Sequence, residues 1–155
     1  MNELKKFYDE KIPVHIRKYL KINLSWDDVN DITKFHENNS HEIRNIDIDS
    51  KSLHFGFYSK KIESFAKKIN LIGLEKDKIY SSHIYIDYAQ SRSPLDWHSD
   101  NCEVIYLQTL GSVKWEIKNY GEYILSEGDI IYCPKKIMHK VSSISPRVGI
   151  SFGIK

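Results

Sequence analysis

The sequence predicts a mainly β fold, a sandwich or barrel, with helices gathered in its N-terminal half. Three observations support this class. Helical periodicity is confined to residues before Lys78, short apolar segments with turn residues between them fill the chain from Ile79 onward, and 155 residues suit one core. Many short strands with regularly spaced turns are typical of sandwiches and barrels. We therefore expect a single domain, with helices and flanking strands in 1–78 and a β core in 79–155.

Two helices are predicted in the first half. Residues 24–38, LSWDDVNDITKFHEN, begin with Ser25 as a potential N-cap and carry Asp28 three residues later, which is a capping-box pattern. After Ser59, the apolar residues of 62–69 fall at positions i, i+3, i+4 and i+7. Both helices have one apolar face, so we expect them to cover one face of the β structure.

The remaining apolar segments predict strands, because they are short, alternate in polarity and end at Gly, Pro, Asn or Ser. In the first half these are a short strand near residue 13, 43–48 and 53–58. In the second half they are 79–88, 97–110, 113–118, 122–125, 129–134, 139–144 and 147–154.

Composition and charge disfavour several classes of function. The formal net charge is only +2 and is evenly spread, without the basic stripe that nucleic-acid binding requires. No apolar run approaches the roughly 20 residues that span a bilayer, and the first residues lack the apolar core of a signal peptide. We expect a cytoplasmic protein, bacterial or, if viral, in the host cytoplasm, with Cys102 and Cys133 as free thiols. The oligomeric state is left open.

A candidate metal site lies in the segment LDWHSDNCEVIY. His98 and Asp100 are two residues apart, so on a strand they would project from one face, roughly 7 Å apart along the chain. His139, at the start of a later predicted strand, is the candidate third ligand. Two imidazoles and one carboxylate form the facial triad of non-haem Fe(II) oxygenases, which leaves other coordination positions open. The alternative interpretation of the pair is a surface turn after SRSPLD.

Arg147 follows His139 by eight residues and opens the last apolar strand, where Ser151 would share its face. A guanidinium at the mouth of a β core needs an anion, since burial of an unpaired charge is costly. A dicarboxylate cosubstrate would supply that anion, with Ser151 as a further contact. The alternative is a salt bridge to an acidic side chain such as Glu103.

Two tyrosines are candidate partners of the same ligand. Tyr106 shares its strand parity with His98 and Asp100, so its hydroxyl could donate to the carboxylate that Arg147 binds. Tyr88 precedes His98 by ten residues. Core or surface packing is the alternative for each tyrosine.

Taken together, YAQSRSPLDWHSD, EVIYLQTLG, EGDIIYCPKKIMHKV and PRVGISF resemble the 2-oxoglutarate/Fe(II)-dependent dioxygenase superfamily, over roughly residues 79–154. The resemblance implies a double-stranded β-helix, the jelly-roll or cupin barrel. It also implies His98, Asp100 and His139 as iron ligands. The prolyl-hydroxylase-like branch further implies that 2-oxoglutarate contacts Arg147, Tyr88 and Tyr106.

The cupin-type JmjC hydroxylases form a second branch that the sequence resembles, through KIPVHIRKYL, LSWDDV and LQTLGSVKW. In that branch a basic residue two positions after the glycine holds the cosubstrate. That position is Val113 here, and Lys114 is one residue off and should point away. The departure favours Arg147 as the cosubstrate anchor.

The resemblance implies an oxygenase that uses Fe(II), 2-oxoglutarate and dioxygen and releases succinate and CO2. A protein side chain or a small molecule would be hydroxylated, and demethylation is also open. One alternative is a cupin-like barrel that binds metal and a small ligand without 2-oxoglutarate turnover, as an isomerase, lyase or binding module. Another is a non-catalytic barrel that binds a partner.

Overall fold

The computed structural model describes residues 3–38, 43–47, 52–56, 79–88 and 96–154. The helix predicted after Ser59 and the end of the strand predicted at 53–58 lie outside these residues. The elements run in the following order: α1 (Glu3–Glu10), β1 (Val14–Ile16), α2 (Trp26–Asn38), β2 (Ile43–Asp47), β3 (Ser52–Gly56), β4 (Ile79–Asp87), β5 (Glu103–Leu110), β6 (Val113–Ile117), β7 (Gly121–Leu125), β8 (Ile130–Cys133), β9 (His139–Ser143) and β10 (Arg147–Ile154).

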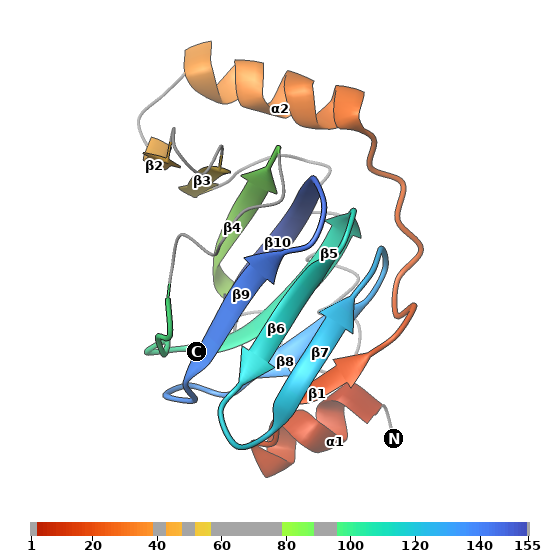
Figure 1. The fold of residues 1–155 in the computed structure, drawn as a ribbon, viewed down its shortest axis with the longest axis vertical. Coiled ribbons are helices and arrows are strands. Elements are labelled where there is room, and N and C mark those ends of the chain that lie inside the picture. Colours follow the sequence, from red (N-terminus) through yellow and green to blue (C-terminus); the bar gives the residue numbers. More distant parts are fainter. Residues whose placement is uncertain (1–2, 39–42, 48–51, 57–78, 89–95, 155) are drawn as a thin grey trace.

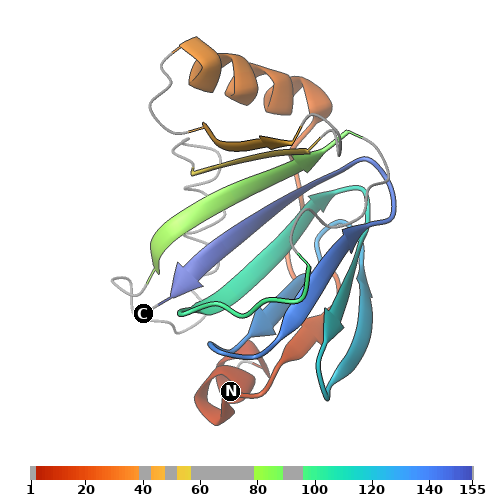
Figure 2. The ribbon, with the colours of Figure 1, turned by 60° about the vertical axis from the view of Figure 1, so that its left-hand side comes forward.

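The strands form two antiparallel sheets that pack face to face. One is a seven-stranded sheet in the order β1-β8-β5-β10-β4-β3-β2, and the other is a three-stranded sheet in the order β7-β6-β9. From β5 onward the chain crosses between the sheets repeatedly, at β5–β6, β7–β8, β8–β9 and β9–β10 (Figures 1 and 2). Such crossings between two sheets form the jelly-roll arrangement that the resemblance implied, within the sandwich or barrel class that the strand spacing predicted.

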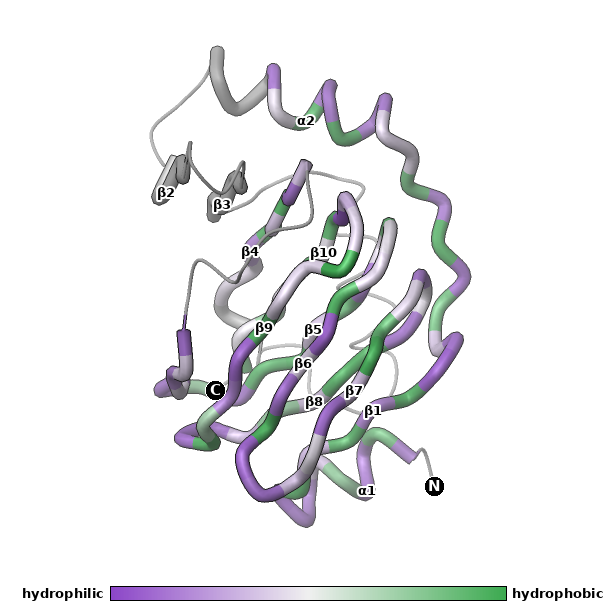
Figure 3. Tube along the Cα trace, in the orientation of Figure 1, coloured by the Kyte–Doolittle hydropathy of each residue, from purple (hydrophilic) through white to green (hydrophobic). Residues whose placement is uncertain are grey.

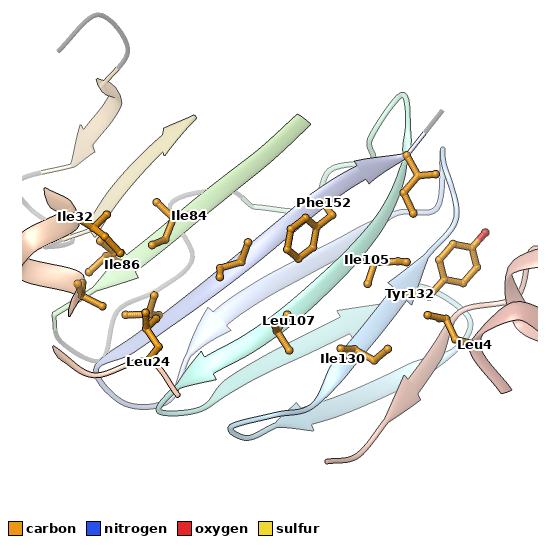
Figure 4. Close-up of a cluster of buried hydrophobic side chains, with 14 of the residues drawn as sticks. Leu4, Leu24, Ile32, Ile84, Ile86, Ile105, Leu107, Ile130, Tyr132 and Phe152 are labelled. Carbon is orange, nitrogen blue, oxygen red and sulfur yellow. The ribbon is translucent and has the colours of Figure 1, made fainter. Parts of the chain in front are cut away.

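The large sheet has an apolar layer on each face, because successive side chains of a strand point to opposite faces. On β5, Val104 and Tyr106 face the small sheet and pack with its side chains. Ile105 and Leu107 face the other way and join the layer under the helices (Figure 4). Apolar residues follow the strands, whereas the turn between β6 and β7 is hydrophilic (Figure 3). The sheet is therefore covered on both faces.

Helix α2 packs on the outer face of the large sheet, as predicted for the helix in residues 24–38. Val29 and Ile32 of α2 pack with the apolar side chains of β4. The predicted capping box is present: the Ser25 N–H donates to the Asp28 carboxylate (2.8 Å) and the Asp28 N–H donates to the Ser25 hydroxyl (3.2 Å).

Helix α1 is a feature that the sequence analysis missed. Leu4 and Tyr8, one turn apart, are its only buried residues, and Tyr8 packs on Tyr132 of β8 with ring centroids 5.5 Å apart. Leu4, Phe7 and Tyr8 fall at helical spacing, but a helix of eight residues is marginal by itself, so its packing against the sheet, including the contact of Tyr8 with β8, stabilises it.

The prediction of one strand over 97–110 was wrong in its first part. Strand β5 begins at Glu103, and within 97–102 only His98 makes a β-bridge, to His139. The backbone carbonyl of Asp100 instead accepts from the Lys136 N–H (2.8 Å) in the turn before β9. The segment is thus a loop fastened to the start of β9.

Within the described residues, no helix has both the length and the apolar character that crossing a membrane requires.

Candidate metal centre

Two histidines from distant parts of the chain lie side by side at one end of β9. The His98 N–H donates to the His139 carbonyl (3.0 Å), and the His139 N–H donates to the His98 carbonyl (2.8 Å). This reciprocal pair fixes both backbones, and it leaves the imidazole ring centroids 4.4 Å apart. The β-bridge to His139, rather than a continuous strand, therefore positions His98.

Asp100 completes a cluster of three potential ligands. One ligand atom each from His98, Asp100 and His139 lies within 4.8 Å of the others. The Nε2 atom of His139 is 3.5 Å from Oδ2 of Asp100. The structure therefore brings together the three residues that the sequence analysis selected as ligands, although Asp100 reaches the cluster from a loop.

Hydrogen bonds set the orientation of both imidazoles. The Nδ1 atom of His98 pairs with the Asp96 carbonyl (2.8 Å), and that of His139 pairs with the Ile137 carbonyl (2.9 Å). Each carbonyl accepts, so each Nδ1 carries a proton, and in the neutral tautomer Nε2 is then the nitrogen with the lone pair. A backbone acceptor on the second ring nitrogen is the usual support of a metal-binding histidine.

The electrostatics of the cluster favour a neutral imidazole at its buried end. The His139 side chain is 3% exposed, whereas that of Asp100 is 37% exposed. Burial and the neighbouring His98 hold the pKa of His139 below its ordinary value, against the Ile137 carbonyl and the Asp100 charge, which act to raise it. Two neutral imidazoles and a carboxylate suit a divalent transition metal, so the residues fit such an ion.

Trp115 of β6 forms one wall beside this cluster. Its ring stacks on His139 with centroids 5.0 Å apart and an interplanar angle of 18°, and it also packs against Tyr106. Trp115 is 3% exposed. Its indole Nε1 is the one buried side-chain nitrogen or oxygen of the described residues that has no hydrogen-bond partner. Unpaired buried donors are rare in folded proteins, so this N–H is available for a ligand.

Arg147 lies at the other end of β9, within a closed polar network. Its Nε donates to the Asp87 carboxylate (2.5 Å) and to the Ser143 hydroxyl (2.8 Å), and its Nη1 donates to the Tyr106 hydroxyl (2.5 Å). The Ser143 hydroxyl also donates to Asp87, and the Tyr106 hydroxyl donates to Gln108 (2.8 Å). Tyr106 and Arg147 are thus together, as predicted, but an internal carboxylate already faces the guanidinium.

The source of that carboxylate corrects the sequence analysis. Glu103, named there as the alternative partner of Arg147, instead accepts from Lys11 (2.5 Å) and from the Tyr132 hydroxyl (3.2 Å). Asp87 is the partner because β4 and β10 pair with Asp87 directly opposite Arg147. The need for an anion was inferred correctly, but the chain itself supplies one.

Strand parity on β4 separates the residues that face the barrel interior from those that do not. Ile84 and Ile86 belong to the outer apolar layer, and Tyr85 packs in the inner one. Burial, then the charge of Asp100, raises the pKa of Tyr85, which places its phenol near the candidate ligands. Tyr88 is 43% exposed and lies beside Trp26 of α2, with ring centroids 6.0 Å apart. The structure therefore brings Tyr85, and not Tyr88, to the candidate site.

Ser151 is half-buried on β10 and stands opposite Tyr106 of β5 and His83 of β4. It shares strand parity with Arg147, as predicted. The sequence analysis missed Asp87 and Tyr85. The alternation of polar and isoleucine residues in HIYIDY could have shown that both share a face.

Comparison with solved structures identifies the architecture. The ribosomal oxygenase YcfD from Escherichia coli superposes with a TM-score of 0.73 at 16% identity, covering 99% of this chain and 51% of YcfD. A second structure of YcfD gives a TM-score of 0.79 at 13% identity, covering 97% and 52% of the two chains. The fold is a double-stranded β-helix of the cupin and JmjC type. This chain spans about half the length of YcfD.

A complex of YcfD with cobalt and 2-oxoglutarate also superposes on the double-stranded β-helix, with a TM-score of 0.73 and 16% identity over 99% of this chain and 51% of that one. No protein-family model and no curated protein sequence matches the chain. The resemblance inferred from the sequence is thus confirmed at the level of the fold.

Proposed function

We propose that this chain is a non-haem Fe(II)- and 2-oxoglutarate-dependent oxygenase. It would hydroxylate a protein side chain or a small molecule and release succinate and CO2. The observation that carries the proposal is the gathering of His98, Asp100 and His139, whose ligand atoms, one ring nitrogen from each histidine and one carboxylate oxygen, lie within 4.8 Å of one another at one end of a double-stranded β-helix.

The residues present would hold a divalent metal on one side only. Among the described residues, no further His, Cys, Asp or Glu joins the cluster of His98, Asp100 and His139. The carbonyls of Asp96 and Ile137 keep both rings oriented, so little ordering remains to be done when a metal binds. A bound Fe(II) would supply the oxidising chemistry with dioxygen, and 2-oxoglutarate would be the co-reactant that loses CO2.

The interior of the barrel would offer Arg147 and Tyr106 as hydrogen-bonding contacts for the far end of the co-reactant. Both are buried, and their side chains are hydrogen-bonded to each other. Between them and the metal ligands stands Trp115, whose unpaired Nε1–H would donate to an oxygen of the bound molecule. Burial raises the pKa of Tyr106, so its hydroxyl stays protonated at neutral pH.

The described surface next to the cluster supports a substrate that arrives from solvent. Asp100 is partly exposed, and Trp97, adjacent to His98, is 43% exposed. The likeness to a protein described as a ribosomal oxygenase favours a protein substrate over a small molecule. An exposed indole beside the ligands would provide an apolar contact for either class.

One observation favours a second candidate, a cupin-like barrel that binds metal and a small ligand without consuming 2-oxoglutarate. The guanidinium of Arg147 already has a buried counterion, Asp87, so its presence alone does not demand a dicarboxylate. Under this candidate the metal cluster is retained, and the Arg147–Asp87 pair is structural.

Metal binding and succinate formation separate the candidates. We expect calorimetric titration under anaerobic conditions to show one Fe(II) per chain. His98→Ala should weaken that binding by more than the roughly 10–100-fold that loss of an outer-sphere partner costs. His36→Ala, in α2, serves as the histidine-to-alanine control and should leave the titration unchanged.

Succinate release from 2-oxoglutarate is then measured with Fe(II), ascorbate and dioxygen, with and without candidate substrates. Metal binding together with succinate formation supports the oxygenase. Metal binding without succinate favours the second candidate. The absence of a metal site would contradict both.

A further inference from the structure

The interior of the barrel has an unusual balance of buried charge. Arg147 is the only buried Lys or Arg among the described residues, and it is 3% exposed. Asp87, 2% exposed, is bound to it through Nε. The pair contributes no net charge where the resemblance would place an uncompensated cation.

Asp87 is firmly held in this position. The backbone register sets it directly opposite Arg147, and the Ser143 hydroxyl donates to the same carboxylate oxygen as the guanidinium. His83 is the nearest other described titratable group on the inward face of β4 besides Tyr85, and it is four residues away, about 13 Å along the strand.

Counted over the described residues alone, the charge of a loaded site follows from these groups, given the metal of the proposed function. A divalent ion and Asp100 together carry one positive charge, the imidazoles are neutral, and the Arg147–Asp87 pair adds nothing. A 2-oxoacid with a single carboxylate brings the total to zero. By contrast, 2-oxoglutarate leaves one negative charge in a region of low dielectric, where an unpaired charge is costly.

We propose that Asp87 is a specificity-determining residue for the cosubstrate of this site. It cancels the attraction that Arg147 would exert on a distal carboxylate. The site therefore accepts a 2-oxoacid with an uncharged distal end about as well as 2-oxoglutarate. This inference rests on the proposed function, and it concerns the class of 2-oxoacid rather than the reaction.

The test compares two ligands of equal carbon number, 2-oxoglutarate and 2-oxovalerate, which differ by a carboxylate in place of a methyl group. Their dissociation constants are measured by calorimetry on the full chain loaded with Mn(II), so that binding is read without turnover. The variants are the wild type, Asp87→Asn and the double variant Asp87→Asn/Arg147→Gln. A ratio of constants taken within one protein is insensitive to differences in stability between variants.

For the wild type we expect the two constants to agree within about threefold. Asp87→Asn should favour 2-oxoglutarate by at least about tenfold more, as expected for removal of a unit charge about 5–8 Å from the ligand carboxylate at an effective dielectric near 20. In the double variant, positions 87 and 147 together again carry no net charge, so the ratio of constants should return to the wild-type value. If Asp87→Asn folds poorly, the wild-type ratio alone still tests whether the site discriminates between the two 2-oxoacids.

Three results would overturn the inference, and they differ in what they say of the proposed function. A wild-type preference of tenfold or more for 2-oxoglutarate, or an unchanged ratio in Asp87→Asn, removes the role of Asp87 and leaves the oxygenase proposal standing. Failure of both 2-oxoacids to bind the Mn(II)-loaded chain removes both proposals.

Discussion

Gly149 of β10 provides a direct test of how the Arg147 network is held. A Cβ added at this glycine would lie 1.7 Å from the Tyr106 hydroxyl, 2.2 Å from Cζ and 2.7 Å from Cε2 of the same ring. The Tyr106 side chain is 2% exposed and hydrogen-bonded to Arg147 and Gln108, so any movement of the ring breaks buried hydrogen bonds. Gly149→Ala therefore sets one methyl group against a fixed ring.

The magnitude follows from the contacts that must be lost. Because the nearest atom of Tyr106 would be 1.7 Å from the added Cβ, that atom has to move by about 1.5–2 Å to reach ordinary van der Waals separation. The hydrogen bond from Arg147 is charge-assisted and worth about 1.5–3 kcal/mol, the one to Gln108 is worth about 1 kcal/mol, and overpacking adds about 1–3 kcal/mol. Because these contributions overlap, we expect Gly149→Ala to lower the free energy of unfolding by about 3–5 kcal/mol.

Urea unfolding of a double-mutant cycle isolates the cause. In a Tyr106→Ala background the ring is gone, so Gly149→Ala should cost less than about 1 kcal/mol there. Mn(II) affinity, measured in parallel, should change little, because the metal ligands lie at the opposite end of β9. Equal costs of Gly149→Ala in both backgrounds would refute the reasoning, since the strain would then not arise from Tyr106.

Three further outcomes are expected. Burial acts to raise the pKa of Asp129, but hydrogen bonds from backbone N–H groups and from His15 hold that pKa below its ordinary value. The contribution of the Asp129 carboxylate to the free energy of unfolding is therefore present above about pH 4 and lost as the pH falls. Asp129→Asn should lower the free energy of unfolding at pH 7 by about 1–3 kcal/mol, and urea titrations should show this deficit shrinking between about pH 5 and pH 2. Trp115→Phe should weaken 2-oxoglutarate binding to the Mn(II)-loaded chain by about 3–10-fold without changing Mn(II) affinity, because it removes one donor; unchanged 2-oxoglutarate affinity would mean that this N–H does not contact the ligand. Iodoacetamide at pH 8, followed by mass spectrometry, should label Cys102 before Cys133, because Cys133 is 1% exposed and burial raises the pKa of its thiol to about 12.

Sequence chemistry predicted those parts of the fold that depend on neighbours along the chain. The capping box at Ser25 and Asp28 needs only residues three apart, and it is present. Strand positions in the second half follow from local alternation and turn residues, so β4 and β6–β10 lie where they were predicted. The same reasoning failed at 97–102, because alternation continues through a loop whose only β-partner is His139.

The same distinction between local sequence and distant strand pairing applies to the candidate site. The three potential ligands were predicted because their residue types and order are restrictive, and the structure brings them together. The partner of Arg147 was not predicted, because any of the 21 acidic residues could satisfy a buried guanidinium and only the register of β4 against β10 selects Asp87. Spacing favoured Tyr88, whereas the parity of β4 brings Tyr85 inward.

Strand β9 connects the two polar centres of the interior. His139 at its first residue belongs to the metal cluster, and Ser143 at its last residue binds Arg147. These residues are about 13 Å apart along the strand, so a molecule that contacts both centres has to be elongated. Trp115 packs against Tyr106 on one side and His139 on the other, and its Nε1–H has no hydrogen-bond partner. The length of β9 thus sets which molecules can reach both centres, while Asp87 sets the charge that their far end can carry.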